Sequence, residues 1–71
     1  MPKEIAGLLM YDLKEISELL DVSTSVLQEY IKNGKLKAKK IGDRYLVEDK
    51  NLREFLEKAD AEEELREEKE N

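Results

Sequence analysis

The spacing of apolar residues along the chain predicts two short helices joined by a tight turn. Asp12 is followed three residues later by Glu15, the spacing of a capping box at a helix N-terminus. Four apolar residues then recur at helical spacing on one face: Leu13, Ile16, Leu19 and Leu20. A second helix is predicted after the N-cap candidate Ser23, with a buried stripe of Val26, Leu27, Tyr30 and Ile31. Asn33-Gly34 ends it, so the pattern is a helix-turn-helix.

The period then changes from helical to extended. Residues 37–41 and 44–47 are predicted as two strands, and Gly42-Asp43 forms the two-residue turn of a hairpin. Asp49 is predicted to cap a last helix, whose apolar stripe is Leu52, Phe55, Leu56 and Ala59.

The ends of the chain carry weaker patterns. Residues 1–10 are interpreted as a leader or a short edge strand, and residues 60–71 as an acidic tail that frays or is disordered. The domain is expected to span residues 11–59. Its predicted fold class is mainly α with a small β-hairpin wing: a winged helix-turn-helix, in the order helix, turn, helix, β-hairpin, helix.

Composition narrows the classes of function. The 71 residues allow one small domain, and they include no cysteine and no histidine. Histidine, which is both the commonest general base and the commonest zinc ligand, is therefore missing. We expect no enzyme, no cofactor and no metal site. A weak divalent-ion site at Glu62–Glu64 is an alternative, but a solvated helix tail explains this run better. No apolar run approaches the roughly 20 residues of a membrane span, which predicts a cytoplasmic protein.

Net charge and local charge point in different directions. The net charge is -5, and residues 57–71 account for all of it with 8 acids and 3 bases. Residues 32–44 instead hold six bases and the single acid Asp43, a basic stripe that a solvated lysine-rich loop would also explain. An overall acidic balance argues against nucleic acid as the partner, whereas this stripe argues for it.

The exposed face of the second predicted helix supplies candidate DNA contacts: Thr24, Ser25, Gln28, Glu29 and Lys32. Gln28 is suited to an adenine edge and Glu29 to a cytosine amino group. Thr24 and Ser25 lie at the positive end of the helix, where a phosphate would bind, although an ordinary polar face remains the alternative.

The predicted hairpin supplies a second set of basic candidates: Lys37, Lys39, Lys40 and Arg44. The lysines are suited to phosphates, and the Arg44 guanidinium to a narrow minor groove. Asp43 at the tip would be repelled by phosphates.

Three segments together resemble the excisionase-type, MerR-like winged helix-turn-helix domains. They are Leu13–Val22 (LKEISELLDV), Ser23–Leu36 (STSVLQEYIKNGKL) and Lys40–Leu56 (KIGDRYLVEDKNLREFL). The resemblance implies binding to double-stranded DNA through the second helix and the wing. It also implies a recombination directionality factor acting beside a recombinase, or a small transcription regulator, working as a monomer or weak dimer that is cooperative on DNA.

The chain departs from the family pattern at four positions. Thr24 and Glu29 stand where basic residues are common, Asp43 stands at a wing tip that is often basic, and Asp21 replaces the glycine of the inter-helix turn. Glu29, Asp43 and the acidic tail support an alternative function, a winged-helix protein-interaction module with little or no DNA binding.

Overall fold

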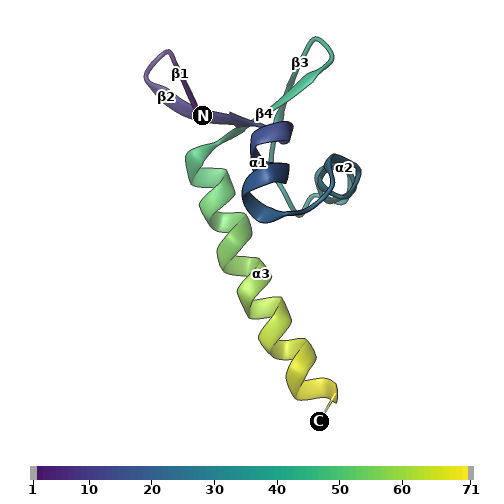
Figure 1. The fold of residues 1–71 in the computed structure, drawn as a ribbon. Helices are drawn as coiled ribbons and strands as arrows, with labels where there is room; N and C mark the ends of the chain where they lie inside the picture. The colour runs from purple at the N-terminus through teal and green to yellow at the C-terminus, as the bar shows by residue number, and fades with distance from the viewer. Residues whose placement is uncertain (1, 71) are drawn as a thin grey trace.

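The structure, a computed structural model, describes the backbone of residues 2–70 and the side chains of residues 2–59. A first hairpin precedes two short helices, and a second hairpin precedes the last helix (Figure 1). The elements are β1 (Lys3–Ile5), β2 (Leu8–Asp12), α1 (Leu13–Leu20), α2 (Thr24–Lys32), β3 (Lys39–Ile41), β4 (Arg44–Glu48) and α3 (Asp49–Glu70). The interpretation of residues 60–71 as a fraying tail lies outside the part whose side chains are described.

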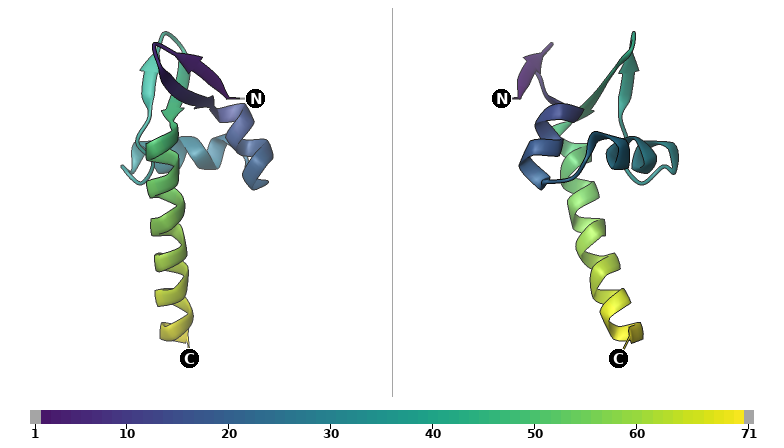
Figure 2. Two further views of the ribbon diagram at one scale, coloured as in Figure 1. Left: turned by 90° about the vertical axis from the view of Figure 1, so that its left-hand side faces the viewer. Right: turned by 45° about the vertical axis from the view of Figure 1, so that its right-hand side comes forward.

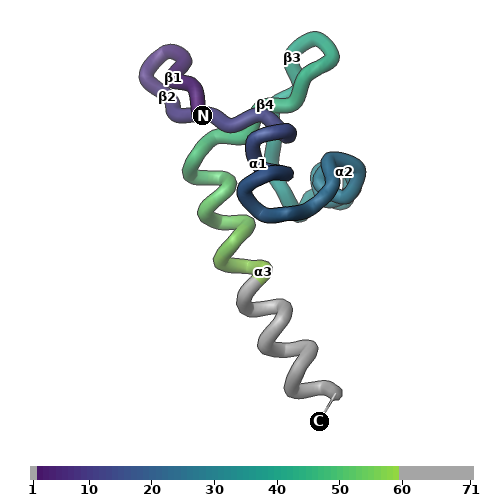
Figure 3. Tube along the Cα trace, viewed as in Figure 1, coloured from purple at the N-terminus to yellow at the C-terminus, as the bar shows by residue number. Residues whose placement is uncertain are grey.

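The four strands form one antiparallel sheet in the order β1-β2-β4-β3. At its centre, Met10–Asp12 of β2 pair with Leu46–Glu48 of β4. The two hairpins diverge from this shared segment, on the side away from the start of α3 (Figures 2 and 3). Of the two interpretations of residues 1–10, the edge strand agrees with the structure, since β1 is the edge of the sheet. The helix-turn-helix and the wing are as predicted, but the sheet has two more strands than the wing alone.

A single apolar core lies between the helices and the inner face of the sheet, the face that carries Val47. The buried members are Leu13, Ile16, Leu27, Leu36, Val47 and Leu52. They come from all three helices, from β4 and from the segment that follows α2. This core fixes α2 relative to the wing, because Leu27 and Val47 belong to the same cluster.

The helix ends are closed as their sequences predict. The Asp12 carboxylate accepts the Glu15 backbone N–H at 2.8 Å, and Glu15 accepts the Asp12 N–H at 3.2 Å, which completes the capping box. Asp21 takes a left-handed conformation (φ 56°) at the end of α1, a role in which an acidic side chain can replace glycine. After α2, the N–H groups of Gly34 and Lys35 bond back to the carbonyls of Ile31 and Tyr30, a Schellman motif.

Several sequence predictions need correction. β3 begins at Lys39 rather than Lys37, because the chain is still turning back toward the core: the Leu36 N–H bonds the Tyr30 carbonyl and the Leu36 side chain is buried. Asp49 was expected to precede the last helix but is its first residue.

Four residues assigned to apolar stripes are exposed: Leu19, Val26, Leu56 and Ala59. Leu19 and Val26 lie at the margins of their helical stripes, about 60° or more from the nearest buried positions on a 100° helical wheel. Leu56 is on the predicted stripe, yet it lies one turn beyond Leu52, where the buried core ends.

Candidate nucleic-acid interface

Helix α2 presents a polar face to solvent while its other face is held in the core. Leu27 is fully buried, and Tyr30 and Ile31 are half-buried against the core. The remaining polar side chains of the helix are exposed, and they include all five predicted contacts: Thr24, Ser25, Gln28, Glu29 and Lys32. An exposed polar face on the second helix of this motif is the surface that enters a major groove.

The ends of α2 suit negatively charged groups at one end and cations at the other. Ser23 caps the first turn, where its hydroxyl accepts the Val26 N–H at 3.2 Å. Thr24 and Ser25 therefore lie at the positive end of the helix dipole, and Lys32 lies in the last turn at the negative end. Phosphate contact at the first turn is favoured by this arrangement.

The aromatic pair Tyr30 and Phe55 holds α2 against α3. Their ring centroids are 5.4 Å apart with the planes tilted by 47°. Lys35 lies on the segment after α2, and its ammonium is 5.8 Å from the centroid of the Tyr30 ring. Lys35 belongs to the basic stripe but is not among the nine predicted DNA contacts. Its position beside the end of α2 makes it a further candidate for contact with DNA.

The wing distributes its lysines over two faces. Lys40 is the cross-strand partner of Tyr45, and its ammonium lies 5.6 Å from the centroid of that ring. Lys39 points to the opposite face, where its ammonium is 3.7 Å from the Glu48 carboxylate. Arg44 shares the face of Lys39. The predicted basic residues of the wing therefore do not form a single surface.

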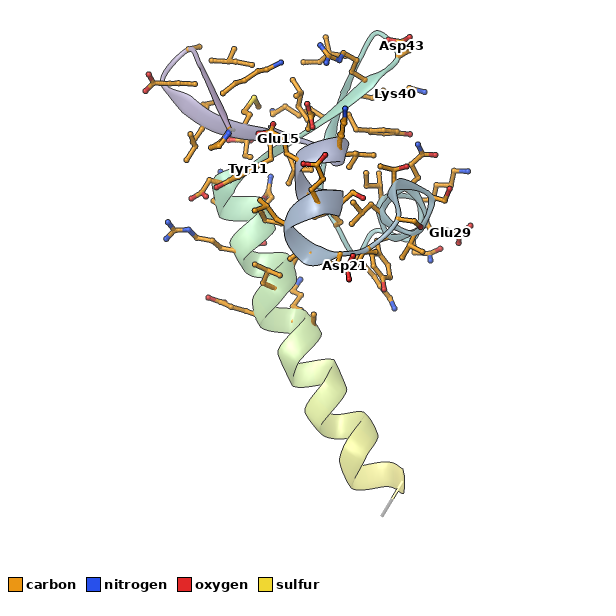
Figure 4. The ribbon with its side chains drawn as sticks, viewed as in Figure 1. Tyr11, Glu15, Asp21, Glu29, Lys40 and Asp43 are labelled. Atoms are coloured by element: carbon orange, nitrogen blue, oxygen red, sulfur yellow. The ribbon has the colours of Figure 1, made fainter. Side chains whose placement is uncertain are left out.

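Lys40 lies on the same side of the molecule as α2. Figure 4 shows Lys40 on the wing and Glu29 on α2 at this common side, with Asp43 at the wing tip. The turn at the tip has a positive φ at Gly42 (65°) and not at Asp43, the φ pattern of a type II′ hairpin. Two acidic side chains, Glu29 and Asp43, thus accompany the basic residues of this side.

A shallow groove of about 410 Å³ lies between the end of α2, the β3–β4 wing and the start of α3, and the segment that follows α2 also lines it. Lys37 and Lys39 line it, together with Glu48 and Asn51. Lys37 is therefore placed beside a recess between three elements rather than on the wing itself. Asn51 had no signal in the sequence that would distinguish it from an ordinary polar residue of the last helix.

A polar link joins β2 to the first turn of α3. The Tyr11 hydroxyl donates to Asp49 Oδ1 at 3.2 Å, and Arg53 Nε lies 2.9 Å from Asp49 Oδ2. Burial raises the pKa of Tyr11 above its ordinary value, and the hydrogen bond to Asp49 raises this pKa further. This link supports the sheet from which the wing extends.

All nine predicted contacts are exposed, but they fall into separate groups. Five lie on α2, Lys40 lies on the wing on the same side of the molecule, and Lys37, Lys39 and Arg44 lie elsewhere. Among the residues with described side chains, no group of three or more histidine, cysteine or acidic residues is arranged to hold a metal ion. In the same part of the chain, no helix is both long and apolar enough to cross a membrane.

The fold and its exposed second helix define the class of helix-turn-helix DNA-binding domains. A family model described as a helix-turn-helix domain matches residues 10–60, and the chain belongs to this excisionase-like family. Comparison with curated proteins and with solved structures gave no significant match.

Proposed function

We propose that the chain is a cytoplasmic DNA-binding module that inserts α2 into the major groove and places the β3–β4 wing on the adjacent backbone and minor groove. The observation that carries the proposal is the exposed polar face of α2, with Lys40 of the wing on the same side. In this arrangement Gln28 and Glu29 meet base edges, while Thr24, Ser25 and Lys40 contact phosphates.

The module would serve either as a recombination directionality factor beside a recombinase or as a small transcription regulator. Both roles require a specific short site and are consistent with the family. Mapping bound sites in cells separates them: sites at the ends of a mobile element support the first role, and sites at promoters support the second.

Fluorescence anisotropy with duplex fragments at several salt concentrations tests DNA binding. We expect affinity to fall as salt rises, because phosphate contacts release counterions. The variant Lys32→Glu reverses a charge at the end of α2, and Lys58→Glu makes the same change on an exposed position of α3. Lys32→Glu is expected to weaken binding and Lys58→Glu to leave it nearly unchanged. Absence of binding at low salt, or equal effects of the two variants, would contradict the proposal.

Glu29 and Asp43 favour a second candidate function, a protein-interaction module on the same fold. Both acids are exposed on the elements that would meet DNA, where phosphates repel carboxylates. This alternative requires that the wild-type chain not bind DNA at low salt, and that the double variant Glu29→Gln, Asp43→Asn not bind it either.

A further inference from the structure

The outer face of the sheet carries apolar side chains, although the core lies on the inner face. Tyr11 and Val47 are paired on the inner face, so their neighbours along each strand point outward. The outward-facing apolar residues are Ile5, Leu8, Met10, Leu46 and Ile41, here called the outer strip. Met10, at its centre, is only 4% exposed, whereas Leu8 is 45% and Ile41 58% exposed.

The outer strip is not explained by the helix-turn-helix. The family match begins at residue 10, so β1 and Leu8 lie outside the region that the family model covers. The β1–β2 hairpin also lies on the opposite side of the molecule from α2 (Figure 1). Clustered large apolar side chains exposed on a small domain mark an interaction site.

The charges around the outer strip are mainly positive. Lys3 and Arg44 share the outward face with it and are exposed, and Lys39 on the same face has Glu48 as its partner. The acids on this face are engaged within the chain: Glu48 is paired with Lys39, and Asp12 caps α1. A partner that covers the strip therefore gains by bringing acidic side chains to its margins.

A second copy of the chain fits this face poorly. The antiparallel register that pairs all three residues of β1 with those of a second β1 places Glu4 opposite Glu4, and like charges directly opposite are destabilising. Two copies stacked about a two-fold axis on the outer strip would oppose one positively charged margin to another.

We propose that the outer strip binds an amphipathic helix of a partner protein, with acidic residues on both sides of the helix's apolar stripe. A helix is the element that packs on a sheet face, and its residues at i, i+3, i+4 and i+7 supply a continuous apolar stripe. Its acids neutralise Lys3, which lies beside Met10 at the centre of the strip, and Arg44, which lies beside Ile41 at one end. This partner site is independent of DNA binding.

Methyl NMR with two synthetic helical peptides tests the proposal in the absence of DNA. The peptides share one leucine stripe, which is flanked by glutamates in the first and by lysines in the second. The acidic peptide is expected to shift the methyl signals of Ile5, Leu8 and Met10 and to leave those of Leu19 and Val26 unchanged. Binding of the basic peptide at the strip should be at least roughly tenfold weaker, since it brings cations to a positive margin.

Two variants at opposite ends of the strip keep the test independent of any one substitution. Leu8→Glu and Ile41→Glu are each expected to weaken the acidic peptide roughly tenfold, because each buries a charge against the apolar stripe. Leu19→Glu, the same change on exposed α1, is the control and should have no effect. Equal binding of both peptides, shifts confined to other methyls, or concentration-dependent shifts without peptide (a second copy on the strip) would each overturn the proposal.

Discussion

Ala6 has a backbone conformation, with positive φ, that its side chain disfavours. It has φ 53° and is followed by Gly7 at φ 80°, the two positive φ values of a type I′ hairpin turn. Glycine adopts this region freely, whereas alanine has a Cβ that crowds the backbone there. Asparagine before glycine is the preferred pair in such turns.

The variant Ala6→Asn is therefore expected to raise the free energy of unfolding by about 0.5–1 kcal/mol. Ala59→Asn is the matched control on exposed α3, where asparagine should cost about 0.5 kcal/mol of stability because of its lower helix propensity. Urea titration measures both. Equal effects of the two substitutions would show that the turn is not strained.

Local sequence predicted the end of each short helix but not every exposed residue. Asp12, Asp21 and Ser23 act through their own side chains or backbone, and a few neighbouring residues suffice to identify such roles. The exposure of Leu56 depends on where the core ends, which is a property of the packed molecule. The cross-strand contact of Lys40 with Tyr45 likewise required the register of the hairpin.

At the scale of elements, the wing separates Lys39 from Lys40 although they are adjacent in sequence. Lys39 has a carboxylate partner, whereas Lys40 lies on the same side of the molecule as α2. Lys40→Ala is expected to reduce the salt dependence of DNA binding by about one phosphate contact, and Lys39→Ala by much less. The slope of log affinity against log salt, measured for both variants, checks this. A larger effect for Lys39→Ala would place DNA on the other face of the wing.

The Tyr11–Asp49 hydrogen bond predicts a pH dependence of stability. The pKa of Tyr11 is raised in the folded state, so the stabilisation is complete below the ordinary tyrosine pKa of about 10 and is lost as pH rises through the folded value. Tyr11→Phe should be less stable than the wild type at neutral pH. This difference should shrink in alkaline solution, which chemical denaturation at a series of pH values measures. A constant difference would show that the hydrogen bond does not carry the effect.

The four-stranded sheet shows why the pattern of elements was only partly predictable. The second hairpin has a recognisable Gly42-Asp43 turn between alternating strands, whereas Ala6-Gly7 is a weaker turn signal. Pairing of β2 with β4 joins residues that are more than 30 positions apart, and nothing in the local sequence marks that contact. The exposed polar face of α2 was predictable because it follows from the apolar stripe on its other side.

At the scale of the whole molecule, charge is divided along the chain. The basic stripe of residues 32–44 is followed by the acidic residues 57–71, whose net charge is -5. We expect these acids to compete with DNA for the basic residues through long-range attraction, which salt screens. Deleting residues 60–71 should strengthen DNA binding at low salt and have little effect at high salt.

A second variant separates charge from chain length. Changing Glu62, Glu63, Glu64, Glu67 and Glu68 to glutamine keeps the residues and removes five negative charges. It should strengthen binding in the same way as the deletion, as measured by anisotropy at two salt concentrations. Unchanged or weaker affinity in both variants would refute a shielding role.

The double pairing of β4 sets how far the wing can bend. β4 pairs with β2 over Leu46–Glu48 and with β3 over Arg44–Leu46, so Leu46 has a partner on each side, whereas Arg44 and Tyr45 have one only on the β3 side. Beyond Leu46 the wing therefore consists of only two residue pairs, Lys40↔Tyr45 and Ile41↔Arg44. The core fixes the other end of β4 to α2, since Val47 and Leu27 belong to the same cluster. We expect α2 and the wing to keep a nearly constant separation and therefore to fit one spacing of DNA grooves. A helix and a wing at fixed separation should bind A-form duplexes poorly, because the deep, narrow major groove of such a duplex does not admit a helix. Competition with double-stranded RNA measures this discrimination.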